Sequence, residues 1–219
     1  MYKKNKICAL IFLREESTRI PNKNLRIFNK KPLFHSILST LEQSKYLDQI
    51  VVNTPSEKII EDCSNFKVKI HKRPDWLNKV DQNEANEIIK FDLNKLDYEF
   101  YLQTHSTNPL LKIETIDRSI ETFFSNINNY DSLFSVNSFK KRFYTINGES
   151  INHDKGQLLP TQNIQPVLME NSCIYIFSKK SFFMNENRIG QIPFLFETEM
   201  IESVDIDYEK DFKLAEKML

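Results

Sequence analysis

Short apolar runs alternate with segments of helical periodicity along the first 136 residues of the chain. The continuous apolar run Ile7–Leu13 is typical of a central parallel strand covered on both faces. Further strands are expected at Gln49–Asn53, Lys67–His71, Glu99–Gln103 and Asp131–Val136. Apolar residues at helical spacing predict helices at Pro32–Lys45, Ser56–Cys63, Glu84–Leu96 and Ile113–Phe124. This alternation predicts a doubly wound α/β fold with a mostly parallel sheet.

The pattern changes after about residue 137. Asn147-Gly148 stands between Phe139–Ile146 and Ser150–Asn152, which predicts a β-hairpin. A polar, proline-bearing stretch follows, as far as Pro166. The remaining expected elements are strands at Cys173–Phe177 and Glu202–Asp207 and a terminal helix at Tyr208–Met218. We interpret residues 137–170 as an excursion from the sheet, inserted within a single domain that covers residues 1–219.

Composition narrows the class of protein. The 219 residues carry 30 basic and 30 acidic side chains, so no global field favours nucleic acid or an anionic membrane as a partner. Three scattered cysteines without CxxC spacing indicate thiols in a reducing compartment, and four scattered histidines argue against a zinc site. The N-terminal apolar run is too short for a signal peptide or a membrane span, so a soluble, cytoplasmic protein is expected.

The loop that follows the first expected strand carries the clearest candidate chemistry. Arg14, Arg19 and Lys23 place three cations within ten residues at the carboxyl end of a parallel strand, where open α/β sheets bind ligands. The chain has only three glycines, none at a strand-to-helix turn in its first half, so the Rossmann and Walker glycine motifs are excluded. Phosphate would therefore have to be bound by side chains. From these residues alone, the alternative to a phosphate-binding loop is a charged loop that is simply solvated.

The same loop resembles the signature loop of the CMP-sugar synthetases, the sialate cytidylyltransferases and their Kdo relatives. The matching residues, in order, are Arg14, Ser17, Arg19, Ile20, Pro21, Lys23 and Asn24. Six further blocks follow in the family's order: Lys31-Pro32-Leu33, Arg73-Pro74, Leu102-Gln103 with Ser106–Leu110, Asp131–Val136, Glu170–Ile176, and Ser203–Asp207 with Asp211. Together they extend over nearly the whole chain.

The resemblance implies a nucleotidyltransferase that transfers CMP from CTP to an acidic sugar, a sialic acid or related nonulosonate, and releases pyrophosphate. It further implies Mg²⁺ as cofactor, a role in making cell-surface polysaccharide, and a homodimer assembled through the 137–170 arm. The implied nucleotide-binding residues are Arg14, Ser17, Arg19, Lys23, Asn24 and Arg73, and those for the sugar are Gln103, Glu170 and Asn171. Asp205 and Asp207 are the implied metal ligands, and Arg14, Lys23 and Asp207 the implied catalytic residues.

Elementary geometry agrees with part of this assignment. Asp205 and Asp207 are two apart on an expected strand, so both carboxylates would face one side, as a shared Mg²⁺ requires. Taken alone, such a pair is more often a polar strand end or the cap of the following helix than a metal site. Asp211 is better explained as a carboxylate at the N-terminus of the last helix.

Some residues depart from the family pattern. Glu15 and Glu16 replace a small pair and would repel a triphosphate unless they point outward or meet a cation or metal. Thr18 replaces a lysine, and His105 stands in a loop one residue longer than usual. Met169 and Glu170 occupy the stretch where an arginine is common. These departures leave open a Kdo, phosphate or phosphonate acceptor, a glycosyltransferase, or a homologue that binds nucleotide without turnover.

Overall fold

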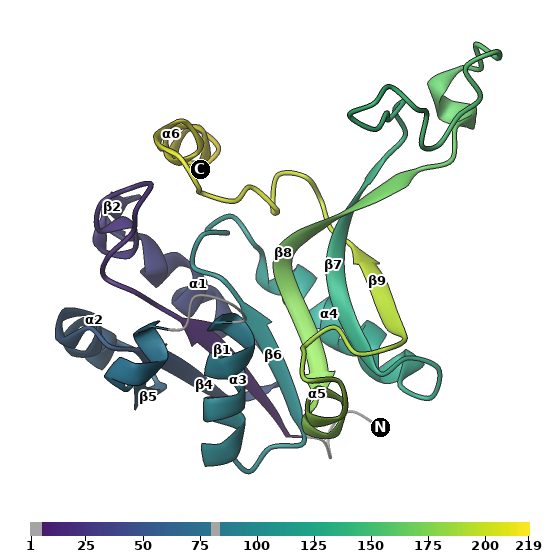
Figure 1. The fold of residues 1–219 in the computed structure, drawn as a ribbon. Coiled ribbons are helices and arrows are strands. Elements are labelled where there is room, and N and C mark those ends of the chain that lie inside the picture. Colours follow the sequence, from purple (N-terminus) through teal and green to yellow (C-terminus); the bar gives the residue numbers. More distant parts are fainter. Residues whose placement is uncertain (1–5, 80–83) are drawn as a thin grey trace.

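The computed structural model describes residues 6–79 and 84–219, and its centre is a seven-stranded sheet (Figure 1). The strands lie in the order β5-β4-β1-β6-β8-β7-β9. Their bounds are β1 Ile7–Phe12, β4 Leu47–Thr54, β5 Val68–Lys72, β6 Phe100–Thr104, β7 Ser132–Phe139, β8 Val167–Ser178 and β9 Pro193–Glu197. A separate two-stranded ribbon joins β2 (Ile27–Phe28) to β3 (Lys31–Pro32).

Most neighbouring strands of the sheet are parallel. β4 pairs in parallel with β1 and β5, β1 with β6, and β7 with β9. β8 is the exception, because it runs antiparallel to both β6 and β7. The predicted α/β fold class with a mostly parallel sheet is therefore confirmed.

Helices cover both faces of the sheet. They are α1 Leu33–Leu41, α2 Glu57–Asp62, α3 Glu84–Lys95, α4 Ile113–Asn126, α5 Lys179–Asn185 and α6 Glu209–Lys217. The side chains of β1 alternate between the two faces, as the period of two in a strand requires. Ile7, Ala9 and Ile11 pack in a cluster with residues of α1 and α4, whereas Cys8 and Leu10 pack with residues of α3 and α5. This burial on both faces explains why the first apolar run has no polar side.

A third, smaller apolar cluster joins the two ends of the described chain. Ile20 and Phe28, from the region after β1, pack against Ile206 and against Phe212 of α6. The Phe28 and Phe212 rings meet edge to face with centroids 5.6 Å apart, a favoured geometry for aromatic pairs. This contact fixes the C-terminal segment over the loop that follows β1.

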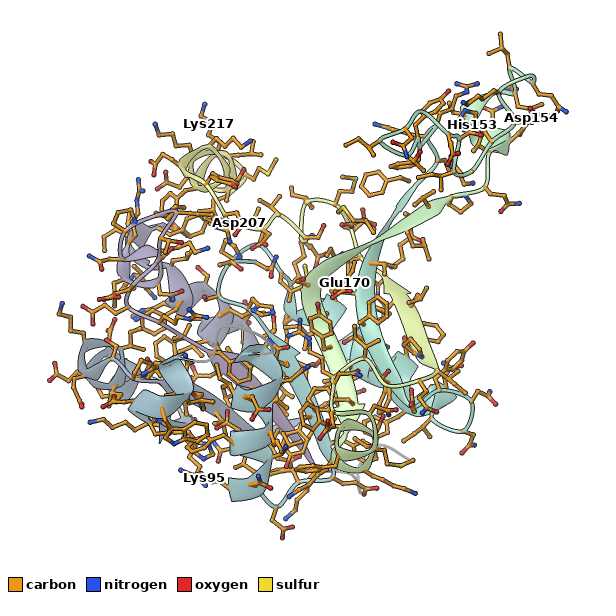
Figure 2. The ribbon with its side chains drawn as sticks, viewed as in Figure 1. Lys95, His153, Asp154, Glu170, Asp207 and Lys217 are labelled. Atoms are coloured by element: carbon orange, nitrogen blue, oxygen red, sulfur yellow. The ribbon has the colours of Figure 1, made fainter. Side chains whose placement is uncertain are left out.

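The ends of β7 and β8 continue into an arm, residues 140–166, that projects away from the sheet (Figure 1). In the arm, Tyr144 pairs with Ser150 across a turn at Asn147-Gly148, so the chain reverses where the hairpin was predicted, but through an isolated bridge rather than two strands. Gly148 has φ of +79°, a conformation that suits glycine. Figure 2 shows His153 and Asp154 near the tip of the arm, far from Asp207.

The strand predicted at Glu202–Asp207 is wrong. A turn followed by an extended segment outside the sheet occupies these residues, and the Ile206 amide donates to the Thr107 carbonyl at 2.9 Å. The strand beside β7 is instead β9, which the sequence analysis did not predict, and α5 was also missed. No helix among the described residues is both long enough and apolar enough to cross a membrane.

Candidate active site

A cavity of about 1050 Å³ opens where three adjacent parallel strands end. The loops that leave the carboxyl ends of β4, β1 and β6 form much of its wall, the position at which open α/β sheets bind ligands. The lining residues are Phe12, Arg14–Arg19, Pro21–Asn24, Pro55, Ser56, Asn78 and His105–Thr107. The predicted Arg14, Ser17, Arg19, Lys23 and Asn24 all lie in this wall.

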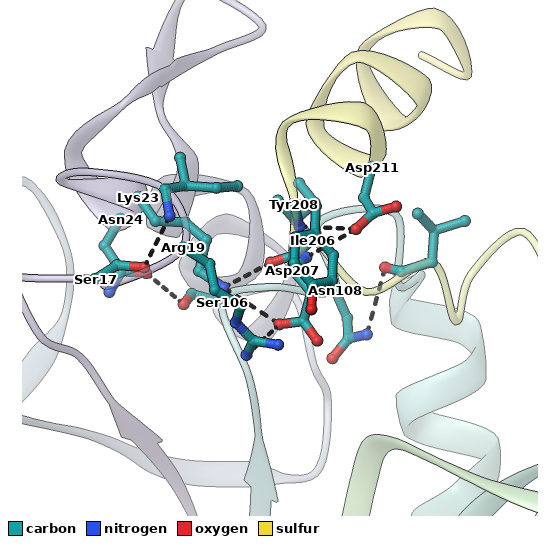
Figure 3. A network of polar contacts seen from close by, with 12 residues as sticks. Ser17, Arg19, Lys23, Asn24, Ser106, Asn108, Ile206, Asp207, Tyr208 and Asp211 are labelled. Carbon is teal, nitrogen blue, oxygen red and sulfur yellow. Dashed lines mark hydrogen bonds and ion pairs between the residues drawn. The ribbon is translucent and has the colours of Figure 1, made fainter.

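Asn24 holds the loop after β1 in shape. Its amide nitrogen donates to the Arg14 carbonyl at 2.7 Å. Its amide oxygen accepts from the Ser106 hydroxyl at 2.6 Å (Figure 3). The residue is buried at 9% exposure, beside a left-handed Asn22 with φ of 52° that opens a short 3₁₀ turn. Asn24 thus joins the loops after β1 and β6 and leaves Arg14 exposed at the cavity wall.

Lys23 and Arg19 converge on Asp207. The Lys23 ammonium donates to the Ile206 carbonyl at 2.6 Å and lies 3.7 Å from a carboxylate oxygen of Asp207. The Arg19 guanidinium lies 2.7 Å from the same oxygen (Figure 3). Burial lowers the pKa of Lys23, while the charges of Asp207 and Asp205 oppose that shift. The structure therefore brings together residues that are more than 180 apart in the sequence.

Asp205 and Asp207 belong to the extended segment that precedes α6. Asp205 is partly exposed to solvent, but desolvation of its carboxyl group still raises its pKa; a hydrogen bond with Thr107 opposes the shift, and the neighbouring charge of Asp207 adds to it. A cation beside both carboxylates would stabilise their negative charge. The two carboxylates therefore suit a divalent ion that takes its remaining ligands from phosphate and water. Within residues 6–79 and 84–219, no group of three His, Cys, Asp or Glu side chains is placed to hold a metal ion alone.

Asp211 has the structural role that the sequence suggests. Its carboxylate accepts from the backbone N–H of Tyr208 at 2.8 Å and from that of Asp207 at 3.3 Å. Both contacts satisfy amides at the start of α6, as a carboxylate in the first turn of a helix does. They also fix the direction of the backbone at Asp207.

Arg73 is buried at 2% exposure and is not among the described residues that line the cavity. Its guanidinium donates to the side chain of Asn53 at 2.7 Å, to the Asn53 carbonyl at 3.1 Å and to the Leu13 carbonyl at 3.5 Å. These bonds connect the ends of β1 and β4 from beneath. Arg73 therefore positions the loop, and its predicted contact with cytidine stays a prediction.

Glu15, one of the departures, meets a cation. Lys58 donates to one of its carboxylate oxygens at 2.5 Å, and the Ser56 hydroxyl donates to the other at 2.7 Å. These hydrogen bonds, with that from Lys58 the larger influence, lower the pKa of Glu15. Its charge is thus partly balanced at the cavity edge.

Gln103, one of the residues predicted to bind the sugar, lies next to His105. Gln103 is fully buried, and its amide nitrogen lies 3.0 Å from Nε2 of His105. Burial, together with the charges of Arg188 and Lys23, lowers the pKa of His105 to about 3. Arg188 donates to the amide oxygen of Gln103, although no sequence motif singled out this arginine.

Glu170 and Asn171 lie on β8. The Tyr175 hydroxyl donates to Glu170, whose own side chain is exposed. The Asn171 amide accepts from the Ser135 hydroxyl at 2.6 Å and donates to the Thr198 hydroxyl at 2.7 Å. Asn171 therefore joins β8 to β7 and to the segment after β9, and the predicted contact of either residue with the sugar stays a prediction.

Comparison with known proteins identifies related sequences. A family model described as cytidylyltransferase matches residues 8–219. The chain is 27% identical to CMP-N,N'-diacetyllegionaminic acid synthase of Legionella pneumophila, over 98% of this chain and 96% of that protein. It is 23% identical to post-translational flagellin modification protein B of Campylobacter coli, over 98% of this chain and 95% of that protein. It is 26% identical to N-acylneuraminate cytidylyltransferase of Streptococcus agalactiae, over 94% of this chain but only 51% of that protein.

Solved structures share the fold. A CMP:2-keto-3-deoxy-manno-octonic acid synthetase complexed with CTP gives a TM-score of 0.68 at 11% identity, covering 98% of this chain and 100% of that one. A 4-diphosphocytidyl-2C-methyl-D-erythritol synthase gives a TM-score of 0.70 at 15% identity, and the match covers 98% of this chain and 99% of that one. At these identities the likeness concerns the fold alone.

Proposed function

This chain belongs to the cytidylyltransferase family, and we propose that it transfers CMP from CTP to the anomeric hydroxyl of an acidic sugar. One observation carries the proposal: Arg19 and Lys23 line a cavity of about 1050 Å³ formed where three parallel strands end, and both converge on Asp207. The cavity is large enough for a nucleotide, and its cations match the charge of a triphosphate.

In this reaction the hydroxyl oxygen attacks the α-phosphorus of CTP. A new P–O bond forms, the bond to the oxygen that bridges to the β-phosphate breaks, the hydroxyl proton passes to solvent, and pyrophosphate leaves. Negative charge grows on the leaving oxygens, so positioning and fixed cations supply most of the catalysis. Lys23 is held in place by the Ile206 carbonyl before any ligand binds, and Arg14 and Arg19 reach the same cavity.

We assign Asp205 and Asp207 to a Mg²⁺ ion. The two carboxylates lie on one extended segment, one of them with a raised pKa, and would hold this ion, which commonly takes one or two carboxylates together with phosphate oxygens and water. When bound, the ion would neutralise charge on the phosphates. Asp207 is paired here with Arg19, whose side chain is half exposed and therefore able to turn from the carboxylate toward a phosphate.

The acceptor that we propose is a sialic acid or a related nonulosonate. The support is the similarity along 94–98% of the chain to proteins named for N-acylneuraminate and for N,N'-diacetyllegionaminic acid.

Pyrophosphate release tests the function. The purified protein is incubated with Mg²⁺, one of CTP, ATP or GTP, and one acceptor from a panel of sialic acid, legionaminic acid, Kdo and neutral sugars. Release is expected only with CTP and an acidic sugar. CTP with Mg²⁺ should also raise the melting temperature more than ATP or GTP does. Equal shifts with all three nucleotides, or release with none of the acidic sugars, would contradict the proposal.

We further propose that the protein is a cytoplasmic homodimer joined through the arm, residues 140–166. The arm exposes large apolar side chains, among them Ile146, Ile151 and Leu158, that a partner subunit would cover. The three buried, free cysteines suit a reducing compartment. Light scattering at micromolar concentration should give twice the mass of the chain, and a monomer would count against the dimer.

A further inference from the structure

Arg188 is a partly buried cation that has no carboxylate partner among the described residues. It follows α5 and precedes β9, and its guanidinium carbon lies 3.5 Å from the centroid of the Tyr175 ring. It donates to the amide oxygen of Gln103. No carboxylate among the described residues forms an ion pair with it, although the charge of Glu170 acts on it from further away.

Such an arrangement is costly unless an anion completes it. Burial lowers the pKa of Arg188, which shows that its surroundings disfavour the charge. Stacking on Tyr175 compensates only partly, because a cation–π contact is weaker than a desolvated ion pair. The planar guanidinium has five N–H donors, and a carboxylate is the anion whose two oxygens match that geometry.

The guanidinium acts on the wall of the cavity through Gln103 and His105. Because the Gln103 oxygen accepts from Arg188, its nitrogen faces Nε2 of His105 at 3.0 Å. His105 lines the cavity, and besides burial the positive charges of Arg188 and Lys23 both lower its pKa. Arg188 is not among the described residues that line the cavity, but its charge and that of Lys23 both act on His105, so it supplies a second positive charge next to the cavity wall.

Glu170 contacts the same tyrosine as Arg188 but forms no ion pair with the arginine. It accepts from the Tyr175 hydroxyl, while Arg188 lies over the Tyr175 ring. Its carboxylate is therefore engaged by the tyrosine, and its charge acts on Arg188 only from a distance.

We propose that Arg188 binds the carboxylate of the acidic acceptor and, through Gln103, orients that acceptor toward the α-phosphate. The inference rests on the proposed function, since it names a specificity-determining residue of the same reaction. It predicts that the acceptor's carboxylate, rather than its hydroxyl groups, is what Arg188 recognises.

The kinetic test compares Arg188→Met, Arg188→Lys and the control Arg118→Met. Arg118 is an exposed arginine of α4 that lies over Phe196, outside the site. Arg188→Met should raise the KM for the acidic sugar about 100-fold and leave the melting shift with CTP unchanged, because a buried charged pair contributes a few kcal/mol. Arg188→Lys should retain part of the affinity, and Arg118→Met all of it. An unchanged KM in Arg188→Met would overturn the inference.

A comparison of the acidic sugar with its carboxamide, which lacks the negative charge, isolates the contribution of the carboxylate to recognition. Wild type should use the acid far better than the amide, and Arg188→Met should treat them alike, an outcome that a merely structural role would not give. If Arg188→Met fails to fold, Arg188→Lys serves in its place, with a reduced preference for the acid expected. Preference for the acid at the wild-type ratio in either variant would overturn the inference.

Calorimetry separates this inference from the proposed function. Acid and amide are titrated into wild type and Arg188→Met in the presence of a non-hydrolysable CTP analogue and Mg²⁺. Binding of the acid that is lost in Arg188→Met upholds the inference even if wild type shows no turnover, in which case the proposed function alone fails. Equal binding of acid and amide by wild type, or binding of neither, overturns it.

Discussion

The ammonium group of Lys23 donates to the carbonyl oxygen of Ile206 at 2.6 Å, across 183 positions of sequence. Lys23 lies in the loop after β1 and Ile206 in the segment before α6, and the apolar cluster of Ile20, Ile206 and Phe212 packs beside them. The bond fixes the direction of a side chain that would otherwise be long and mobile. Cation and carboxylates are thus preorganised, which reduces the cost of ordering them when a triphosphate binds.

Replacing Lys23 by methionine should lower turnover by about 100-fold or more, because a fixed cation at the developing charge is lost. Lys23→Arg should not restore it fully, since a planar guanidinium cannot reproduce the compact ammonium that bonds to the Ile206 carbonyl. Pyrophosphate release at saturating CTP measures both. Lys213→Met, on the exposed face of α6, is the matched control and should behave as wild type. Near-normal turnover in Lys23→Met would refute the role of Lys23.

Asp205 and Asp207 should act as a unit. Asp205→Asn and Asp207→Asn keep the size of each side chain but remove charge from the proposed metal site, so each should lower Mg²⁺-dependent turnover by about 100-fold or more. The double variant should lose little more than the worse single one, as happens when residues serve one function. Titration of Mg²⁺ against rate measures the effect. Full additivity in the double variant would show two independent roles.

Asp211→Asn controls for charge lost from the same segment. The asparagine oxygen can still accept from the amides of Tyr208 and Asp207, so turnover should change little. Asp211→Ala removes that acceptor and should lower the free energy of unfolding by about 1 kcal/mol. A loss of turnover in Asp211→Asn as large as that in Asp207→Asn would place Asp211 in the metal site instead.

Burial patterns made the fold predictable where strands are covered on both faces. The run at β1 predicted a central strand, and its alternating side chains do enter two clusters. The same logic failed at Glu202–Asp207, where Val204 and Ile206 alternate with acidic residues as in a strand. There the backbone bonds to the Thr107 carbonyl and Ile206 is buried beside α6, so the alternation reflects packing on a loop.

The candidate site was predictable only where chemistry follows local sequence. The loop from Arg14 to Asn24 is one continuous segment, so its residues gather without knowledge of the topology. Arg188 lies 85 positions from Gln103, and its contact arises because β8 pairs antiparallel with β6. β9 is short, begins with proline and lies at the edge of the sheet, which weakens its strand pattern.

His105 should make stability depend on pH. Its folded-state pKa is about 3 against an ordinary 6.5, so the unfolded chain binds a proton that the native protein does not. Stability is therefore lost as pH falls from 6.5 toward 3, by about 2 kcal/mol at pH 5 at roughly 1.4 kcal/mol per pKa unit. Urea unfolding at pH 7 and 5 should show this loss in wild type and a smaller one in His105→Gln. His153→Gln, in the arm, is the control, and equal losses in His105→Gln and wild type would contradict the assignment.

The pairing of Glu15 with Lys58 predicts how an acidic residue is tolerated at a triphosphate site. Lys58 is exposed on α2, is not among the described residues that line the cavity, and donates to Glu15 at 2.5 Å. Lys58→Met should free the Glu15 carboxylate beside the phosphates and raise the KM for CTP several-fold at low salt. The effect should shrink at high ionic strength, because exposed charges are screened.

A double-variant cycle decides whether Glu15 is the cause. Glu15→Gln alone should leave the KM for CTP equal to or below that of wild type, since it removes a repulsive charge and keeps a side chain that can bond to Ser56. Glu15→Gln combined with Lys58→Met should restore the wild-type KM, so the two changes should be strongly non-additive. If the double variant binds CTP as weakly as Lys58→Met, then Lys58 contributes to nucleotide binding through its own charge. In that case Glu15 does not repel the triphosphate even without Lys58, because the Ser56 hydroxyl and solvent stabilise its carboxylate.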